Sequence, residues 1–135
     1  PVIVDQARTA IELGAETSLS GVHAPGWQDI VRHAEKGDEL CLKLIDKLCF
    51  YLSIGLTSIV NSFDPEVIFL GHDIALAGSL LTGKLASAVS QRMISSKYKN
   101  IKIETSKFIN KSPIVGSCAL VFEKLFNGET AEDIL

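Results

Sequence analysis

The stretch from residue 61 to residue 78, NSFDPEVIFLGHDIALAG, decides the fold class. Pro65 ends a helix, because the residue before a proline is driven out of the helical region. VIFL at 67–70 is a run of β-forming residues without alternation, which is typical of a strand covered on both faces. The turn Gly-His-Asp at 71–73 follows, and ligands of α/β proteins bind outside the carboxyl ends of strands. This turn is therefore the candidate site.

The surrounding sequence alternates between helical and strand patterns. Apolar residues at three- and four-residue steps predict helices, and Asp38 is placed to cap the longest one. That helix is apolar on nearly every side, so we expect it to be buried nearly all round. The predicted elements are helices over 2–14, 27–36, 39–62, about 18 residues after the turn, and 112–127, with strands at 67–70 and 101–106. A strand, a helix and a strand form one right-handed βαβ unit with parallel strands. We predict a helix-rich α/β fold.

The composition excludes several classes of protein. A chain of 135 residues with 47% hydrophobic and 21% charged residues is one globular domain and is not mainly disordered. The net charge of −3, with scattered basic residues, argues against direct nucleic-acid binding, and the longest uncharged helical run, 48–60, is too short to cross a membrane. Three cysteines without CxxC spacing predict reduced thiols in a cytoplasmic protein. Because the chain begins with Pro1, we expect a fragment of a longer protein.

Several short pieces in register carry a resemblance to a known family. They are AEKGD at 34–38, Gly55-Leu56 followed by Ile59, Val60 and Asn61, DPE at 64–66, VIFLG at 67–71, and IVGSCALV at 114–121. Together they resemble the C-terminal part of the ROK family, named for repressor, open reading frame and kinase. The match runs from about residue 30 to 127. The resemblance implies the actin-like, ribonuclease H-like fold of sugar kinases, with this chain as part of the C-terminal lobe.

Other elements of the family do not occur in this sequence. It has no CxCGxxGC loop for zinc, no phosphate-binding DxGxT turn and no aspartate in the position of the family's catalytic base. We therefore expect no catalytic residue and no metal site here, and neither sugar phosphorylation nor operator binding by this segment alone. His23 and His33 have no ligands at metal spacing and are expected at the surface. Residues 16–18 are expected to form a polar loop, with pocket lining as the alternative.

The turn at 71–73 departs from the kinase pattern. The resemblance implies three glycines here, which let the backbone approach adenosine. Gly71 is kept, but His72 and Asp73 replace the others, and a carboxylate opposes a polyanion. We therefore expect ATP not to bind, and these residues, with Gly116 as a secondary candidate, form a degenerate nucleotide site. The alternatives for His72 and Asp73 are a helix cap, direct ligand contact, and acid–base chemistry.

Two functions and one structural role remain open from the sequence. The first is the effector-sensing segment of a sugar-responsive ROK repressor, and the second is the C-terminal lobe of an ATP-dependent ROK sugar kinase. The third is an oligomerisation domain, because the resemblance implies a homo-oligomer, with a dimer expected, formed through this lobe. The resemblance also implies that the sugar contacts come from residues upstream of this segment.

Overall fold

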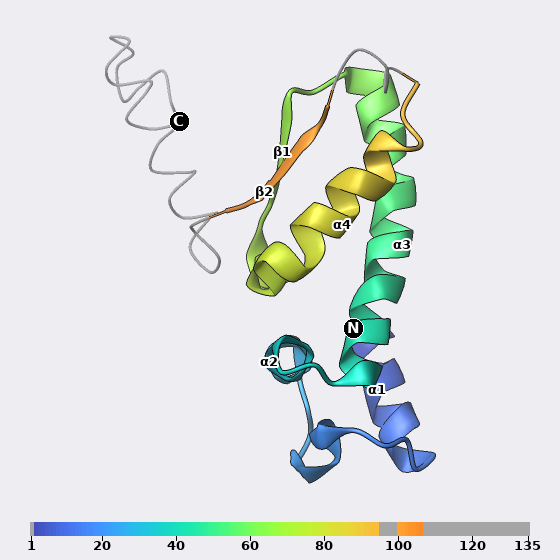
Figure 1. Cartoon of the computed structure of the whole chain (residues 1–135), viewed down its shortest axis with the longest axis vertical. Coiled ribbons are helices and arrows are strands. Elements are labelled where there is room, and N and C mark those ends of the chain that lie inside the picture. The colour runs from blue at the N-terminus through green and yellow to red at the C-terminus, as the bar shows by residue number, and fades with distance from the viewer. Residues whose placement is uncertain (1, 95–99, 107–135) are drawn as a thin grey trace, which may run out of the picture.

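The computed structural model describes residues 2–94 and 100–106 (Figure 1). In chain order the elements are α1 (Val2–Glu12), the 3₁₀ helix η1 (Ser18–Gly21), α2 (Trp27–Glu35), α3 (Glu39–Phe63), β1 (Val67–Leu70), the 3₁₀ helix η2 (His72–Ala77), α4 (Gly78–Ser90) and β2 (Lys102–Thr105). The predicted helix-rich α/β order is confirmed over this range. The predicted helix at 112–127, with Gly116 and Cys118, lies outside the described residues.

The ends of α3 follow from local sequence chemistry. Gly37 has φ +89°, a conformation that costs glycine little because it has no Cβ. The side chain of Asp38 then accepts a hydrogen bond from the backbone N–H of Cys41 at 3.0 Å and caps the helix. At the other end Asp64 adopts a left-handed conformation with φ +45°, directly before Pro65. The predicted cap and stop of this helix are confirmed.

The long helix α3 is the axis on which the other elements are arranged (Figure 1). Helices α1 and α2 pack near its N-terminal half, and α4 packs along its C-terminal half. A single connected core runs between them. Its fully buried members include Leu19, Ile30, Cys41, Ile45, Leu81, Leu85 and Val89. The core therefore joins the helical first third of the chain to the strand–helix–strand unit.

The two strands pair in parallel, as predicted. Val67 lies opposite Lys102 and Leu70 lies opposite Thr105. One more backbone hydrogen bond follows the last pair, in which the N–H of Ser106 donates to the carbonyl of Leu70 at 2.8 Å. The loop that follows β1 therefore leaves the carboxyl end of the sheet, where the candidate turn lies.

Polar contacts join α3 to α4 and to the residues after it, among them a hydrogen bond from the backbone N–H of Ile94 to the side-chain oxygen of Asn61 at 3.0 Å. Lys84 forms an ion pair with Asp46. A guanidinium N–H of Arg92 donates to the hydroxyl of the fully buried Ser53 at 2.8 Å, and its charge lies 5.3 Å from the centre of the Phe50 ring. These contacts supplement the apolar packing of the two helices. The Arg92 contact also gives the buried Ser53 hydroxyl a hydrogen-bond partner, as buried polar groups require.

The segment after β1 differs from the single helix of about 18 residues predicted there. It consists of the 3₁₀ helix η2 followed by the 13-residue helix α4. The two are separated at Gly78, whose φ of +47° and ψ of −130° cannot continue a right-handed helix. Because of this break, η2 and α4 are two separate helices, and the turn at 71–73 leads into η2 and not into α4.

Two burial predictions are wrong over the described residues. Helix α3 is apolar on most sides, yet Phe50, Tyr51 and Phe63 are exposed, because its neighbours cover only part of its surface. Strand β1 is not covered on both faces either. Leu70 joins the core, whereas the Phe69 side chain points to the other face and is 61% exposed.

No helix among residues 2–94 and 100–106 is long and apolar enough to cross a membrane.

Candidate functional site

The turn after β1 places two polar side chains at the end of the strand. Gly71 has an extended backbone, and a Cβ built on it would meet nothing within 4 Å. His72, by contrast, has φ +58°, a left-handed conformation that favours glycine. The conformation that needs glycine is therefore at position 72, one residue later than the glycine in the sequence.

Asp73 does not cap a helix, so the cap prediction is wrong. The N-cap residue of η2 is Gly71, and no side chain accepts a hydrogen bond there. Instead, a carboxylate oxygen of Asp73 lies 3.4 Å from Nδ1 of His72. The two side chains are 55% and 78% exposed, respectively, so a contact of this kind contributes little to stability. Both are accessible to a ligand.

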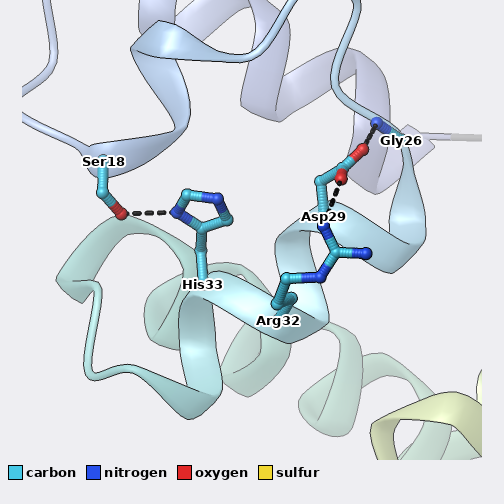
Figure 2. Close-up of polar contacts among 5 residues, drawn as sticks. All are labelled: Ser18, Gly26, Asp29, Arg32 and His33. Carbon is cyan, nitrogen blue, oxygen red and sulfur yellow. Dashed lines mark hydrogen bonds and ion pairs between the residues drawn. The ribbon is translucent and has the colours of Figure 1, made fainter.

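Trp27 links this turn to the first third of the chain. Its indole N–H donates to the backbone carbonyl of Asp73 at 2.6 Å, across 46 residues of sequence. The start of α2 that carries Trp27 is itself held in place: the N–H of Gly26 donates to Asp29 at 3.0 Å, and Arg32 lies 3.6 Å from the same carboxylate (Figure 2). The indole is therefore fixed between α2 and η2.

A cavity of about 390 Å³ opens beside this hydrogen bond. Its walls come from α1, α2, α3 and η2, and they are mostly apolar. The lining residues are Val2, Ile3, Val4, Trp27, Leu48, His72, Asp73 and Ile74. None of them is a lysine or an arginine, so the described part of the lining offers no permanent positive charge to a phosphate group.

A second polar cluster lies where η1, α2 and α3 meet. One carboxylate oxygen of Asp38 accepts hydrogen bonds from the Thr17 hydroxyl at 2.8 Å, the Ser18 backbone N–H at 2.7 Å and the Ser18 hydroxyl at 2.8 Å. The Ser18 oxygen also lies 2.6 Å from Nδ1 of His33 (Figure 2). Because the serine proton goes to Asp38, Nδ1 of His33 must donate to the serine oxygen.

This cluster is not arranged for nucleophilic catalysis. In a catalytic triad the imidazole accepts the serine proton and the carboxylate orients the imidazole. Here the Ser18 hydroxyl donates its hydrogen bond to the carboxylate directly, and Asp38 is joined to His33 through the backbone, where the N–H of Asp38 donates to the carbonyl of His33 at 3.0 Å. The loop at 16–18, predicted as polar, therefore serves to fasten η1 and the end of α2 to the start of α3.

The Asp38 carboxylate is held in its charged form. Burial alone would raise its pKa, but the hydrogen bonds from Cys41, Ser18 and Thr17 outweigh burial and lower the pKa well below the ordinary value. Burial raises the pKa of the Cys41 thiol to about 12, and Asp38 acts in the same direction. Cys41 and Cys49 are buried and free, as predicted.

Among the candidate residues, His72 and Asp73 line the cavity, Gly71 precedes them as the N-cap residue of η2, and Gly116 lies outside the described residues. No group of three His, Cys, Asp or Glu side chains suited to a metal occurs in the described part of the chain. Sequence reasoning missed Trp27, Leu48 and the residues of α1, because they reach the turn only through tertiary packing. Trp27 is the only tryptophan of the chain, and this was the one feature of the sequence that could have pointed to these missed residues.

The arrangement of α3, the parallel strands and the intervening helix matches solved structures of one group of proteins. A ROK family transcriptional regulator, a homologue of the Escherichia coli Mlc protein, superimposes with a TM-score of 0.74 at 27% identity, over 82% of this chain and 28% of that one. A ROK family glucokinase from Streptomyces griseus, solved with glucose and AMPPNP, has a TM-score of 0.64 at 20% identity, over 86% of this chain and 36% of that one. The fold is that of the actin-like sugar kinases.

Comparison of the sequence with known families and proteins leads to the same group as the structural comparison. The model of the ROK family matches residues 7–124, and this chain belongs to that family. The xylose repressor of Caldicellulosiruptor bescii is 29% identical over 73% of this chain and 25% of its own length. The repressor Mlc of Escherichia coli is 26% identical over 70% of this chain and 23% of its length. The glucokinase of Thermotoga maritima is 24% identical over 68% of this chain and 29% of its own length. The chain spans about a quarter of the length of these relatives.

Proposed function

We propose that this chain is the effector-sensing and oligomerisation segment of a sugar-responsive ROK repressor, and that it catalyses no reaction by itself. The relatives named as xylose repressors and as Mlc support this assignment. The observation that carries it is the turn after β1. There His72 is held in a left-handed conformation and Asp73 places a carboxylate at the cavity, where a nucleotide-binding turn would present bare backbone.

The charge of the cavity supports the same conclusion. A triphosphate carries several negative charges, and among the described residues that line the cavity there is one carboxylate, that of Asp73, and no lysine or arginine. Phosphate sites in proteins are usually built from lysine, arginine or converging backbone N–H groups. A cavity with this lining is therefore a poor site for ATP.

In this proposal the segment acts by population shift. A sugar bound largely by other parts of the protein would favour one arrangement of the two lobes, and the change would be passed on to a DNA-binding unit that is not part of this segment. The segment would contribute to a homo-oligomer, with a dimer expected, in the cytoplasm. The alternative is the C-terminal lobe of a ROK sugar kinase, which the match to the Thermotoga maritima glucokinase favours.

The test is calorimetric titration of ATP into the full-length protein and into the double variant His72→Gly/Asp73→Gly. We expect no heat of binding for the unmodified protein up to about millimolar ATP, and measurable binding by the variant, because glycine removes both side chains and the local negative charge. The single variant Asp73→Asn is the matched control that changes the charge alone. Micromolar binding of ATP by the unmodified protein would establish the kinase alternative.

A further inference from the structure

The cavity beside the turn has the size of a small-molecule site. Its volume of about 390 Å³ lies within the range of roughly 300–1,000 Å³ usual for such sites. Five apolar side chains line it together with the Trp27 ring. They come from separate elements, so the walls are set by the packing of α1, α2 and α3 and do not depend on one loop. A compact ligand would be largely removed from water here.

The polar groups of the cavity select the charge of that ligand. Asp73 contributes a carboxylate that is still 55% exposed, and an oxygen of this carboxylate lies 3.4 Å from Nδ1 of the neighbouring His72. Among the residues that the structure describes, the lining contains no lysine or arginine, and the Trp27 indole offers an aromatic surface of the kind that attracts cations. An anion would meet repulsion from the carboxylate, whereas a cation would gain from both groups.

We propose that this cavity binds a compact organic ammonium ion, with its apolar part between the walls and its charged nitrogen at Asp73. The proposal concerns a ligand separate from the sugar effector, and it does not depend on the repressor assignment. Its test uses a different pair of ligands from the ATP titration, so a failure of this proposal and a failure of the repressor assignment are distinguishable.

The hydrogen bond from Trp27 to the Asp73 carbonyl supplies a direct readout. A ligand that enters the cavity changes the surroundings of the indole, and Trp27 is the only tryptophan among the 135 residues. Tryptophan fluorescence of this chain should therefore follow occupancy of the cavity, and calorimetry provides an independent measure of affinity.

The experiment titrates the chain with 2-phenylethylammonium and, separately, with 3-phenylpropanoate, which has a similar shape but the opposite charge. At about pH 8 and low salt we expect the ammonium ion to bind with a dissociation constant of about 1 mM or below, at least tenfold tighter than the carboxylate. The preference should shrink as salt is added, because the charge contact is partly exposed.

Two variants test whether Asp73 causes the preference for the ammonium ion over the carboxylate. Asp73→Asn should bring the two ligands to within about threefold of each other, while Glu35→Gln, which removes one negative charge from an exposed position of α2 outside the cavity lining, should leave the preference unchanged. Equal affinity for the two ligands in the unmodified chain would overturn the proposal. So would a preference that survives Asp73→Asn, or the absence of any binding of the ammonium ion up to about 10 mM.

Discussion

Replacing Leu85 with alanine is expected to lower the free energy of unfolding by about 3–4 kcal/mol, the largest effect of any single change considered for this chain. Leu85 is fully buried on α4, where that helix packs against α3. Removing three carbon atoms forfeits their burial and leaves a cavity that the rigid surroundings refill only in part. Urea denaturation followed by circular dichroism measures the change.

Leu80→Ala is the matched control on the same helix. Leu80 is only half-buried, so the same truncation should cost about 1 kcal/mol. Equal losses for the two variants would mean that α4 does not pack on α3 through Leu85, and this would contradict the core described here.

Asp38→Ala is expected to cost about 2–3 kcal/mol, because it removes a helix cap and a charged acceptor together. The carboxylate accepts hydrogen bonds from Thr17 and Ser18 in one part of the chain and from Cys41 in another. Its loss should therefore loosen the 16–18 loop as well as the first turn of α3. Denaturant unfolding measures the first effect, and amide exchange at the Ser18 and Cys41 N–H groups measures the second.

Two control variants separate these contributions. Asp38→Asn keeps an acceptor of the same shape but not its charge, so we expect about half of the loss. Glu39→Ala removes a neighbouring carboxylate that forms an exposed pair with Lys43, and it should change stability by less than about 0.5 kcal/mol. If Glu39→Ala costs as much as Asp38→Ala, general charge at the helix start and not the Asp38 hydrogen bonds would be responsible.

The contribution of Asp38 should also be visible in the pH dependence of the free energy of unfolding. The pKa of Asp38 is lower in the folded chain than in the unfolded chain, so the unfolded chain binds the proton more tightly. The stability that Asp38 contributes is therefore fully present above its unfolded pKa of about 3.9, and it is lost as the pH falls towards the folded value. Stability measured between about pH 6 and pH 2 should fall less steeply in Asp38→Ala than in the unmodified chain. Parallel curves would contradict this assignment.

Features that depend on neighbouring residues could be predicted from the sequence. The capping of α3 by Asp38, the left-handed Gly37 before it and the stop before Pro65 each follow from the backbone chemistry of one or two residues. The parallel strands were predictable as well, because a helix between two strands leaves the chain no short antiparallel return. Motifs in register also sufficed to indicate the ROK family before any comparison.

The surroundings of the turn at 71–73 and the coverage of the helix and strand faces depend on tertiary packing and could not be predicted from the sequence. Trp27 and Leu48 reach the cavity from distant parts of the chain, and periodicity along a helix does not say which other element its apolar side meets. For the same reason the sequence overestimated the burial of α3 and of Phe69. Local rules act through adjacent backbone groups, whereas burial and ligand sites depend on how whole elements pack, and that packing is set by contacts between residues far apart in the chain.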